Sequence, residues 1–286
     1  MSFDIDDLLA ILDLEALEPN LFRGQSPNVG WQRIFGGQVI AQALVAATRT
    51  VEDRHIHSLH CYFLRPGDPS APILYEVDAI RDGKSFTTRR VVASQKDRPI
   101  FSLSASFQIP EEGYDHQIDM PEIPAPEDLP SEEDFIEKYQ EIAPKHITDY
   151  WSRPRPIEVR PVTVEHYFSS KKLEPVQHIW MRTKSPIPED HLTSSAVLAY
   201  LSDMTLLDTS LYAHGTSIFN KQLQVASLDH AIWFHRKADL SNWILFTQDS
   251  PSASGAKGFT RGSLYNRSGQ LIASVAQEGL IRHRKM

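Results

Sequence analysis

The sequence contains a long internal repeat, and this repeat constrains the fold more than any other feature. Residues 57–65 (HSLHCYFLR) align with residues 228–236 (LDHAIWFHR) at an offset of about 171 residues. Two shorter pairs of segments repeat at nearly the same offset, namely 85–87 with 258–260 and 99–101 with 270–272. A repeat of this length indicates a duplicated fold that packs against itself.

The first copy combines an apolar helix with a β-meander. Residues 39–47 (VIAQALVAA) carry no charge and follow Gly36 and Gly37, which predicts a helix buried on most sides. The run is too short to span a membrane, so other parts of the protein must surround it. Strand-like runs separated by turn signals follow at 57–65, 73–81, 86–95 and 99–108. We also expect a short amphipathic helix over residues 4–17, with Asp4 as its N-cap.

The pattern returns after a proline-rich connection. Residues 110–135 contain five prolines and many acidic residues, which indicates an extended linker, and a short helical stretch follows near 132–142. We predict a mainly apolar helix at 193–208 and strands at 156–167, 176–183, 228–236, 243–249, 256–265 and 270–281. The predicted organisation is an α+β chain with an N-terminal unit at 1–110, a linker at 111–155 and a C-terminal unit at 156–286.

Composition excludes several classes of protein. A hydrophobic fraction of 41% is that of a globular protein, and a net charge of −8 argues against a general nucleic-acid binder. A single cysteine, Cys61, cannot form an internal disulfide or a cysteine-based zinc site. The chain has no H-E-x-x-H spacing, P-loop, dinucleotide-binding glycine pattern or G-x-S-x-G motif, so we expect neither a metal nor a cofactor. The acidic start of the chain and the lack of a long apolar run lead us to expect a cytoplasmic protein without a membrane span.

Several segments spread along the chain resemble the acyl-CoA thioesterase II (TesB-type) family of double hotdog proteins. They are 21–26 (LFRGQS), 35–38 (FGGQ), 62–68 (YFLRPGD), 229–236 (DHAIWFHR), 258–262 (GFTRG) and 276–279 (AQEG). The resemblance implies two tandem units, each with a curved antiparallel sheet wrapped around a long helix. It also implies hydrolysis of medium- to long-chain acyl-CoA to fatty acid and CoA by direct attack of water. Hotdog sheets commonly pair at their edges, so we expect a homo-oligomer, either a dimer or a tetramer.

The same resemblance points to three catalytic residues. Asp203, late in an apolar helix-like run, matches the acid of the family, and burial there would raise its pKa. Gln277 matches the family glutamine, which together with the acid holds the hydrolytic water. Ser227 stands where the family usually has threonine, so the hydroxyl is kept and the methyl group that restricts χ1 is lost. We therefore expect the water site to survive with looser geometry.

Other residues are candidates for substrate binding. Backbone N–H groups at the helix start near Gly36 and Gly37 can polarise a carbonyl, although a glycine pair is also typical of a tight turn. His57 or His60 could face the cleft, with a structural role in the core or an interface as the alternative. Four basic residues could bind the phosphates of CoA or simply lie on solvated strand faces, namely Arg65, Arg89, Lys257 and Arg261.

Two other functions remain open at this stage. A hotdog enoyl-CoA hydratase or dehydratase would need an Asp–His pair placed to add water to an alkene, and no such motif is evident. A non-catalytic acyl-CoA-binding module is the second alternative, because the serine at position 227 departs from the family pattern. Release of free thiol from acyl-CoA would distinguish a thioesterase from both.

Overall fold

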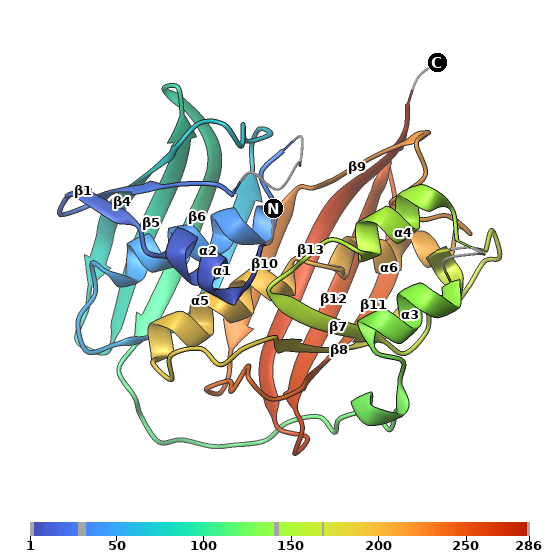
Figure 1. The fold of residues 1–286 in the computed structure, drawn as a ribbon. Coiled ribbons are helices and arrows are strands. Elements are labelled where there is room, and N and C mark those ends of the chain that lie inside the picture. Colours follow the sequence, from blue (N-terminus) through green and yellow to red (C-terminus); the bar gives the residue numbers. More distant parts are fainter. Residues whose placement is uncertain (1–2, 28–32, 140–142, 168, 285–286) are drawn as a thin grey trace.

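The computed structural model describes residues 3–27, 33–139, 143–167 and 169–284. In this part of the chain, two lobes lie side by side, and each presents a curved antiparallel sheet to a central helix (Figure 1). The two central helices are α2 (Gly36–Thr48) and α5 (His191–Ser202), and they pack against each other. The structure thus has the helix-in-sheet arrangement that the repeat predicts.

The strands of both lobes join in one sheet. The strands of the first lobe are β1 (Glu15–Glu18), β2 (Leu21–Gly24), β3 (His55–Phe63), β4 (Ile73–Asp82), β5 (Phe86–Gln95) and β6 (Arg98–Gln108). Those of the second lobe are β7 (Ile157–Pro161), β8 (Val176–Thr183), β9 (Leu223–Ser227), β10 (Asp229–Phe234), β11 (Ile244–Ser254), β12 (Lys257–Asn266) and β13 (Leu271–His283). The order is β1-β2-β4-β5-β6-β3-β10-β13-β12-β11-β8-β7, with β9 on β13. The lobes therefore meet where β3 pairs with β10.

The register of β3 and β10 places a local twofold axis at this junction. His60 lies opposite Ala231, and Leu59 lies opposite Ile232. An offset of 171 residues carries position 60 to 231, so the repeat maps this central pair onto itself. The two lobes are thus related by a pseudo-twofold axis that passes close to His60 and Ala231.

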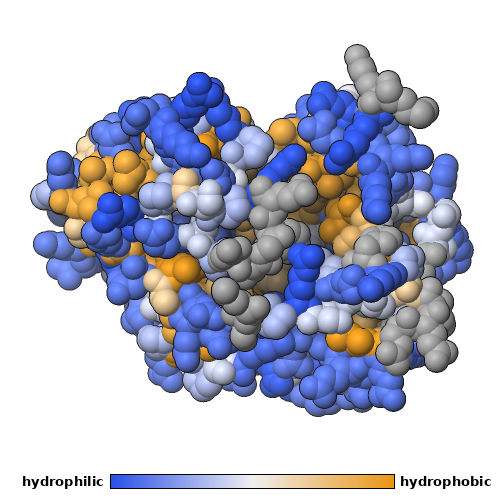
Figure 2. All heavy atoms as spheres, turned by 45° about the horizontal axis from the view of Figure 1, so that its top comes forward, coloured by the Kyte–Doolittle hydropathy of each residue, from blue (hydrophilic) through white to orange (hydrophobic). Residues whose placement is uncertain are grey.

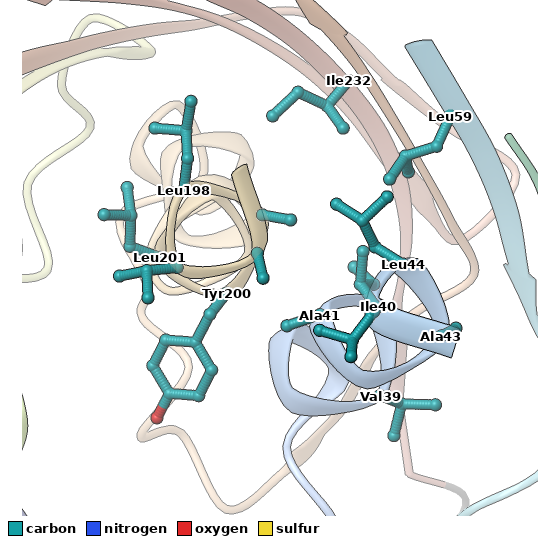
Figure 3. Packing of buried hydrophobic residues seen from close by; sticks show 14 of the residues in the cluster. Val39, Ile40, Ala41, Ala43, Leu44, Leu59, Leu198, Tyr200, Leu201 and Ile232 are labelled. Atoms are coloured by element: carbon teal, nitrogen blue, oxygen red, sulfur yellow. The ribbon is translucent and has the colours of Figure 1, made fainter. Parts of the chain in front are cut away.

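The core lies between the two helices and the sheet above them. Leu44 on α2 and Leu198 on α5 are both fully buried, and the side chains of Leu59 on β3 and Ile232 on β10 point toward them (Figure 3). Burial of each such side chain stabilises the fold by about 1.5–3 kcal/mol. Since the strands and helices of both lobes contribute, this core fixes how the lobes sit against each other.

A buried polar network anchors α2 to the N-terminal segments. The Gln42 side chain donates to the carbonyl of Ile11 (2.6 Å) and of Gln25 (2.9 Å), and it accepts from the Tyr75 hydroxyl (2.7 Å). A Cβ atom at Gly24 would lie 2.9 Å from the Gln42 Nε2 atom, so a larger residue there would displace the Gln42 amide from these bonds. The network holds the middle of α2 against the N-terminal segments.

The N-terminal region differs from the predicted helix over 4–17. Helix α1 (Ile5–Leu12) begins with Asp4 in a capping box with Asp7, as expected, but ends at Leu12. The exposed strand β1 follows it and pairs with β2, and neither strand was predicted. The side chains of β1 show no alternation because it is a short edge strand that is exposed throughout, whereas those of β2 alternate between half-buried and buried.

The connection between the lobes packs onto the second sheet. It contains η1 (Pro126–Asp128), α3 (Glu132–Tyr139) and α4 (Lys145–Trp151). Met120, Ile123 and Leu129 pack on Trp180 and its neighbours on the outer face of the second sheet. The Trp180 indole also donates to the carbonyl of Pro124 (3.0 Å). The proline-rich segment is therefore a strap held against the C-terminal lobe.

The predicted helix over 193–208 is two helices. Helix α5 ends at Ser202, Asp203 is its C-cap, and α6 (Leu206–Tyr212) begins three residues later. The cluster of polar residues from Ser202 to Thr205 breaks the helix. Asp203 thus lies at a helix end, where the expectation from sequence placed it inside a helix. None of the helices in the described part of the chain is long and apolar enough to cross a membrane.

Candidate active site

Three polar side chains from the C-terminal lobe meet at the end of α5. The Gln277 Nε2 atom on β13 donates to the Asp203 Oδ1 atom, and the Ser227 hydroxyl at the end of β9 donates to the same oxygen at 3.3 Å. Ser227 lies opposite Gly279 on β13, two residues beyond Gln277, so strand pairing sets the positions of the hydroxyl and the amide. The structure therefore brings together the three residues that the sequence singled out.

The environment of Asp203 makes its carboxylate a proton acceptor near neutral pH. Surrounding protein desolvates the carboxylate, and this raises its pKa to about 6. Hydrogen bonds from Gln277, Ser227 and the Gly37 backbone N–H lower the pKa in part. The group is thus mostly ionised at pH 7 and yet far more basic than an exposed aspartate.

The start of α2 belongs to the N-terminal lobe and faces the Asp203 carboxylate. A Cβ atom at Gly36 would lie 2.5 Å from the Asp203 Oδ2 atom, and one at Gly37 would lie 2.3 Å from the carbonyl oxygen of Tyr200. Only glycine allows this approach of the two helix ends. The positive end of α2 and the side chains of the other lobe therefore share one site. On the face shown in Figure 2, the surface is hollowed between the two lobes.

Gln277 contributes an unused acceptor to the site. The residue is 1% exposed, and its Oε1 atom is buried without a hydrogen-bond partner among the described residues. Buried amide oxygens are nearly always hydrogen-bonded to protein or to water. Because its Nε2 atom is committed to Asp203, the orientation of the amide is set, and the Oε1 atom remains to accept a hydrogen bond from a small molecule in the site.

A second layer of contacts holds the end of α5 in place. The hydroxyl of Ser202, next to Asp203, lies 2.9 Å from the Nε2 atom of buried His230, and the Cys61 thiol donates to the His230 carbonyl at 3.2 Å. Asp229 accepts from the Glu278 backbone N–H at 2.7 Å. Asp229 and His230 thus act in structural hydrogen bonds, and the buried Cys61 is not placed as a nucleophile.

Three of the predicted basic residues lie on strand or loop surfaces and are bonded to protein. Arg65 donates to the Pro99 carbonyl, Lys257 pairs with Glu278 at 3.0 Å, and Arg261 pairs with Asp249. The partner of Lys257, Glu278, directly follows Gln277 in the chain.

Two predicted substrate-binding residues do not contact these three side chains. His57 lies beside Ser106, with its Nε2 atom 2.8 Å from the hydroxyl, and lines a separate pocket. Arg89 is 5% exposed and is held by Thr50 and by Asp82 in an ion pair of 2.8 Å. Arg89 therefore stabilises the end of α2, and its guanidinium is not available to a ligand.

Sequence reasoning missed two features, one of them at the site. The Phe63 ring, at the end of β3, would lie 2.9 Å from a Cβ atom at Gly36 and so forms part of the wall. Asp208 on α6, away from these three side chains and close to Tyr167 and Tyr212, is a second buried acid, and desolvation raises its pKa to about 7. An acidic residue in the apolar run 206–212 was the available signal for Asp208. In the residues that the structure describes, no group of three or more His, Cys, Asp or Glu side chains could hold a metal ion.

Two tandem helix-in-sheet units, with a carboxylate, an amide and a hydroxyl of one facing the helix start of the other, define a double hotdog protein. Family models match two parts of the chain: acyl-CoA thioesterase N-terminal domain at residues 23–108 and acyl-CoA thioesterase at residues 148–280. Acyl-CoA thioesterase 2 of Haemophilus influenzae is 40% identical over 283 residues, which cover 99% of each chain. The chain therefore belongs to the acyl-CoA thioesterase family, and its reaction is hydrolysis of an acyl-CoA thioester.

Solved structures agree with this assignment. A crystal structure of an acyl-CoA thioesterase II, TesB2, from Mycobacterium marinum superposes with a TM-score of 0.80 at 40% identity, covering 97% of this chain and 99% of that chain. A hot dog fold protein from Alicyclobacillus acidocaldarius gives a TM-score of 0.77 at 21% identity, covering 97% and 98%. The second likeness concerns the fold alone. The predicted double hotdog architecture is confirmed.

Proposed function

We propose that the protein hydrolyses medium- to long-chain fatty acyl-CoA by direct attack of a water molecule held by Asp203, Ser227 and Gln277. The observation that supports this most strongly is the convergence of the three side chains on one point at the junction of the lobes. Asp203 has the desolvated carboxylate that a general base requires at neutral pH. The buried, unpaired Gln277 Oε1 atom supplies an acceptor for the water.

The reaction balances without a covalent enzyme intermediate. The water oxygen bonds to the thioester carbonyl carbon as one of its protons passes to the Asp203 carboxylate. The carbonyl oxygen gains negative charge and faces the positive end of α2 near Gly36 and Gly37. The C–S bond then breaks, the proton held by Asp203 goes to the departing sulfur, and fatty acid and CoA leave. The Ser227 hydroxyl keeps the base oriented throughout.

Isotope labelling tests this route. Hydrolysis in ¹⁸O-enriched water under single-turnover conditions should place one labelled oxygen in the fatty acid, with thiol and acid released together. A burst of thiol ahead of acid would indicate an acyl-enzyme and would contradict direct attack. Thiol release across a series of acyl lengths tests the proposed chain-length class, and enoyl-CoA serves as a comparison substrate whose conjugated double bond should persist.

We propose further that residues 1–110 and 156–286 are the two functional units and that 111–155 is their connection. We also propose that the protein works as a cytoplasmic homo-oligomer, either a dimer or a tetramer. The exposed edge strand β1 supports association, because an unpaired strand edge is a ready surface for pairing. Sedimentation of the purified protein at several concentrations tests the state, and a monomer throughout would contradict it.

A further inference from the structure

A second pocket lies at the opposite end of α5 from Asp203. It is a cavity of about 220 Å³ between the start of α5, the start of β3, and the chain that follows β6 and β10. Ile56, Leu198 and Phe234 form its apolar wall. None of the three proposed catalytic residues lines it.

The pseudo-twofold axis relates this pocket to the active site. Phe63 and Phe234 end the paired strands β3 and β10, and each lines one of the two sites. Likewise Gly36 begins α2 beside Asp203, while His191 begins α5 beside the second pocket. The second pocket is thus the counterpart of the catalytic cleft in the other half of the duplication.

The groups that activate water are missing from this counterpart. Asp203 is the C-cap of α5, and the C-cap of α2 is Arg49. The Arg49 side chain donates to Asp13 and to the Leu14 carbonyl. Ser227 pairs with Gly279, and in the other lobe Ile56 pairs with Phe107. Gln277 lies two residues before Gly279, and the residue two before Phe107 is Ala105. Arginine, isoleucine and alanine therefore replace the acid, the hydroxyl and the amide.

Imidazoles gather at the second pocket instead. The rings of His55 and His191 stack with centroids 3.9 Å apart and an interplanar angle of 11°. His57 and His235 each place one nitrogen against a serine hydroxyl, Ser106 and Ser274. Their other ring nitrogens have no partner among the described residues and can carry a proton for a ligand.

The fixed charges around the pocket nearly cancel. Arg236 pairs with Asp115, Lys237 donates to the Glu189 carbonyl at 2.8 Å, and Glu111 accepts from Gln108 at 3.0 Å. The N-cap Asp190 is bonded to Thr193. The histidines therefore decide the sign of the local potential, since imidazole is the side chain that most readily gains a charge between pH 5 and 8.

We infer that this pocket is a non-hydrolytic oxyanion site, which binds a phosphate group when its histidines are protonated. The stacked pair His55 and His191 would repel each other as two cations, and an anion beside them removes this cost. Burial lowers the pKa of His57, His191 and His235, so the empty pocket favours neutral rings at pH 7. Binding of an anion therefore takes up protons. The inference does not depend on the proposed mechanism, because the two sites share no side chain.

Titration of the full-length protein with inorganic phosphate tests the inference. Calorimetry at about pH 5.5 and about pH 8 should give binding at least about tenfold tighter at the lower pH. NMR of ¹³C-labelled histidine should show the pKa of the pocket imidazoles rising when phosphate is added. CoA is the second titrant. If CoA binds this pocket more tightly than inorganic phosphate does, the natural ligand is a nucleotide and not free phosphate. Titration with octanoate shows whether the pocket binds a carboxylate as tightly as a phosphate.

The variants are His55→Gln and His191→Gln, each of which removes one ring of the stacked pair. His55 is exposed, so its replacement leaves the fold intact, and His214→Gln provides a matched control at an exposed histidine elsewhere. Both pocket variants should weaken phosphate binding at about pH 5.5 by about tenfold or more, and the control should not. Equal affinity at the two pH values, or unchanged binding in both pocket variants, would overturn the inference.

Discussion

The amide nitrogen of Gln277 donates a hydrogen bond to the Oδ1 atom of Asp203, and this bond connects β13, the last strand of the chain, to the end of α5. It fixes which oxygen of Asp203 is occupied and which face of the Gln277 amide remains available. The Gly37 backbone N–H from the other lobe also bonds the carboxylate. The base is therefore oriented by both halves of the duplicated chain, which is why neither half alone contains a complete site.

The rate of hydrolysis should depend on the ionisation of Asp203. Because desolvation raises the pKa of this carboxyl to about 6, the base is ionised at pH 7 and protonated below pH 6. The value of kcat/KM should be flat above about pH 7 and fall about tenfold per pH unit below about pH 5.5. The check is a pH profile of thiol release from one acyl-CoA. A profile that stays flat down to pH 4 would show that no group of this pKa takes part.

Replacement of Gly36 by alanine should disturb the site while the fold is retained. The added Cβ atom would lie 2.5 Å from Asp203 Oδ2 and 2.9 Å from the Phe63 ring, so the carboxylate must shift. We expect kcat to fall about 10- to 100-fold, since a misplaced base loses much of its effect. Gly113→Ala is the matched control, because nothing lies within 4 Å of its new Cβ atom. Equal activity in both variants would mean that this approach of α2 has no catalytic role.

Ser227 should influence both the rate and the pH profile. Its hydroxyl donates to Asp203 at 3.3 Å, and this bond lowers the pKa of the carboxyl. Ser227→Ala should reduce kcat about tenfold and move the acid limb of the profile to higher pH. Ser227→Thr should keep the limb in place and leave kcat equal or a few-fold higher, since the methyl group restricts χ1. The pH profiles of the two variants, measured side by side, test whether the Ser227 hydroxyl lowers the pKa of Asp203. An acid limb that moves to lower pH in Ser227→Ala would contradict the assigned bond.

The ionised Asp203 carboxylate should lower the free energy of unfolding at neutral pH. Its pKa is raised from 3.8 to about 6, so the folded state binds the proton more tightly than the unfolded chain. The stabilisation that comes from protonated Asp203 is fully present below pH 3.8 and is lost as pH rises through about 6. Asp203→Asn should therefore raise the free energy of unfolding at pH 7 by about 1–3 kcal/mol relative to the native chain. Urea unfolding at pH 4 and pH 7 measures this, and a gain confined to pH 4 would reverse the assigned direction of the shift.

The sequence allowed most of the fold to be predicted, because the duplication and the apolar run 39–47 both report on burial. Strands β5 and β6 begin and end close to the predicted residues, since alternation and turn residues define such hairpins locally. Strand β1 was missed because an exposed edge strand has no apolar face to reveal it. The break at Asp203 was missed because the runs on both sides are apolar, and the short polar stretch between them was included in one predicted helix.

The site could be predicted in its residue types and only partly in its contacts. Ser227, Gln277 and Asp203 come together as the family resemblance implied, although strand pairing across the sheet brings them there. Arg89 and His57 were expected at the substrate and lie elsewhere. Sequence marks a cation or an imidazole, but only the fold shows that Arg89 is held by Asp82 and that His57 lines another pocket.

The central claim is that Asp203 activates water, and a kinetic comparison of Asp203→Asn with the native chain tests it most directly. Asparagine keeps an acceptor for Gln277 and Ser227 and cannot take a proton. We predict that kcat for thiol release falls about 10²- to 10⁴-fold, with the affinity for CoA unchanged and the protein folded. Native activity in this variant would contradict this claim, because Asp203 is the group whose carboxylate accepts hydrogen bonds from both Ser227 and Gln277.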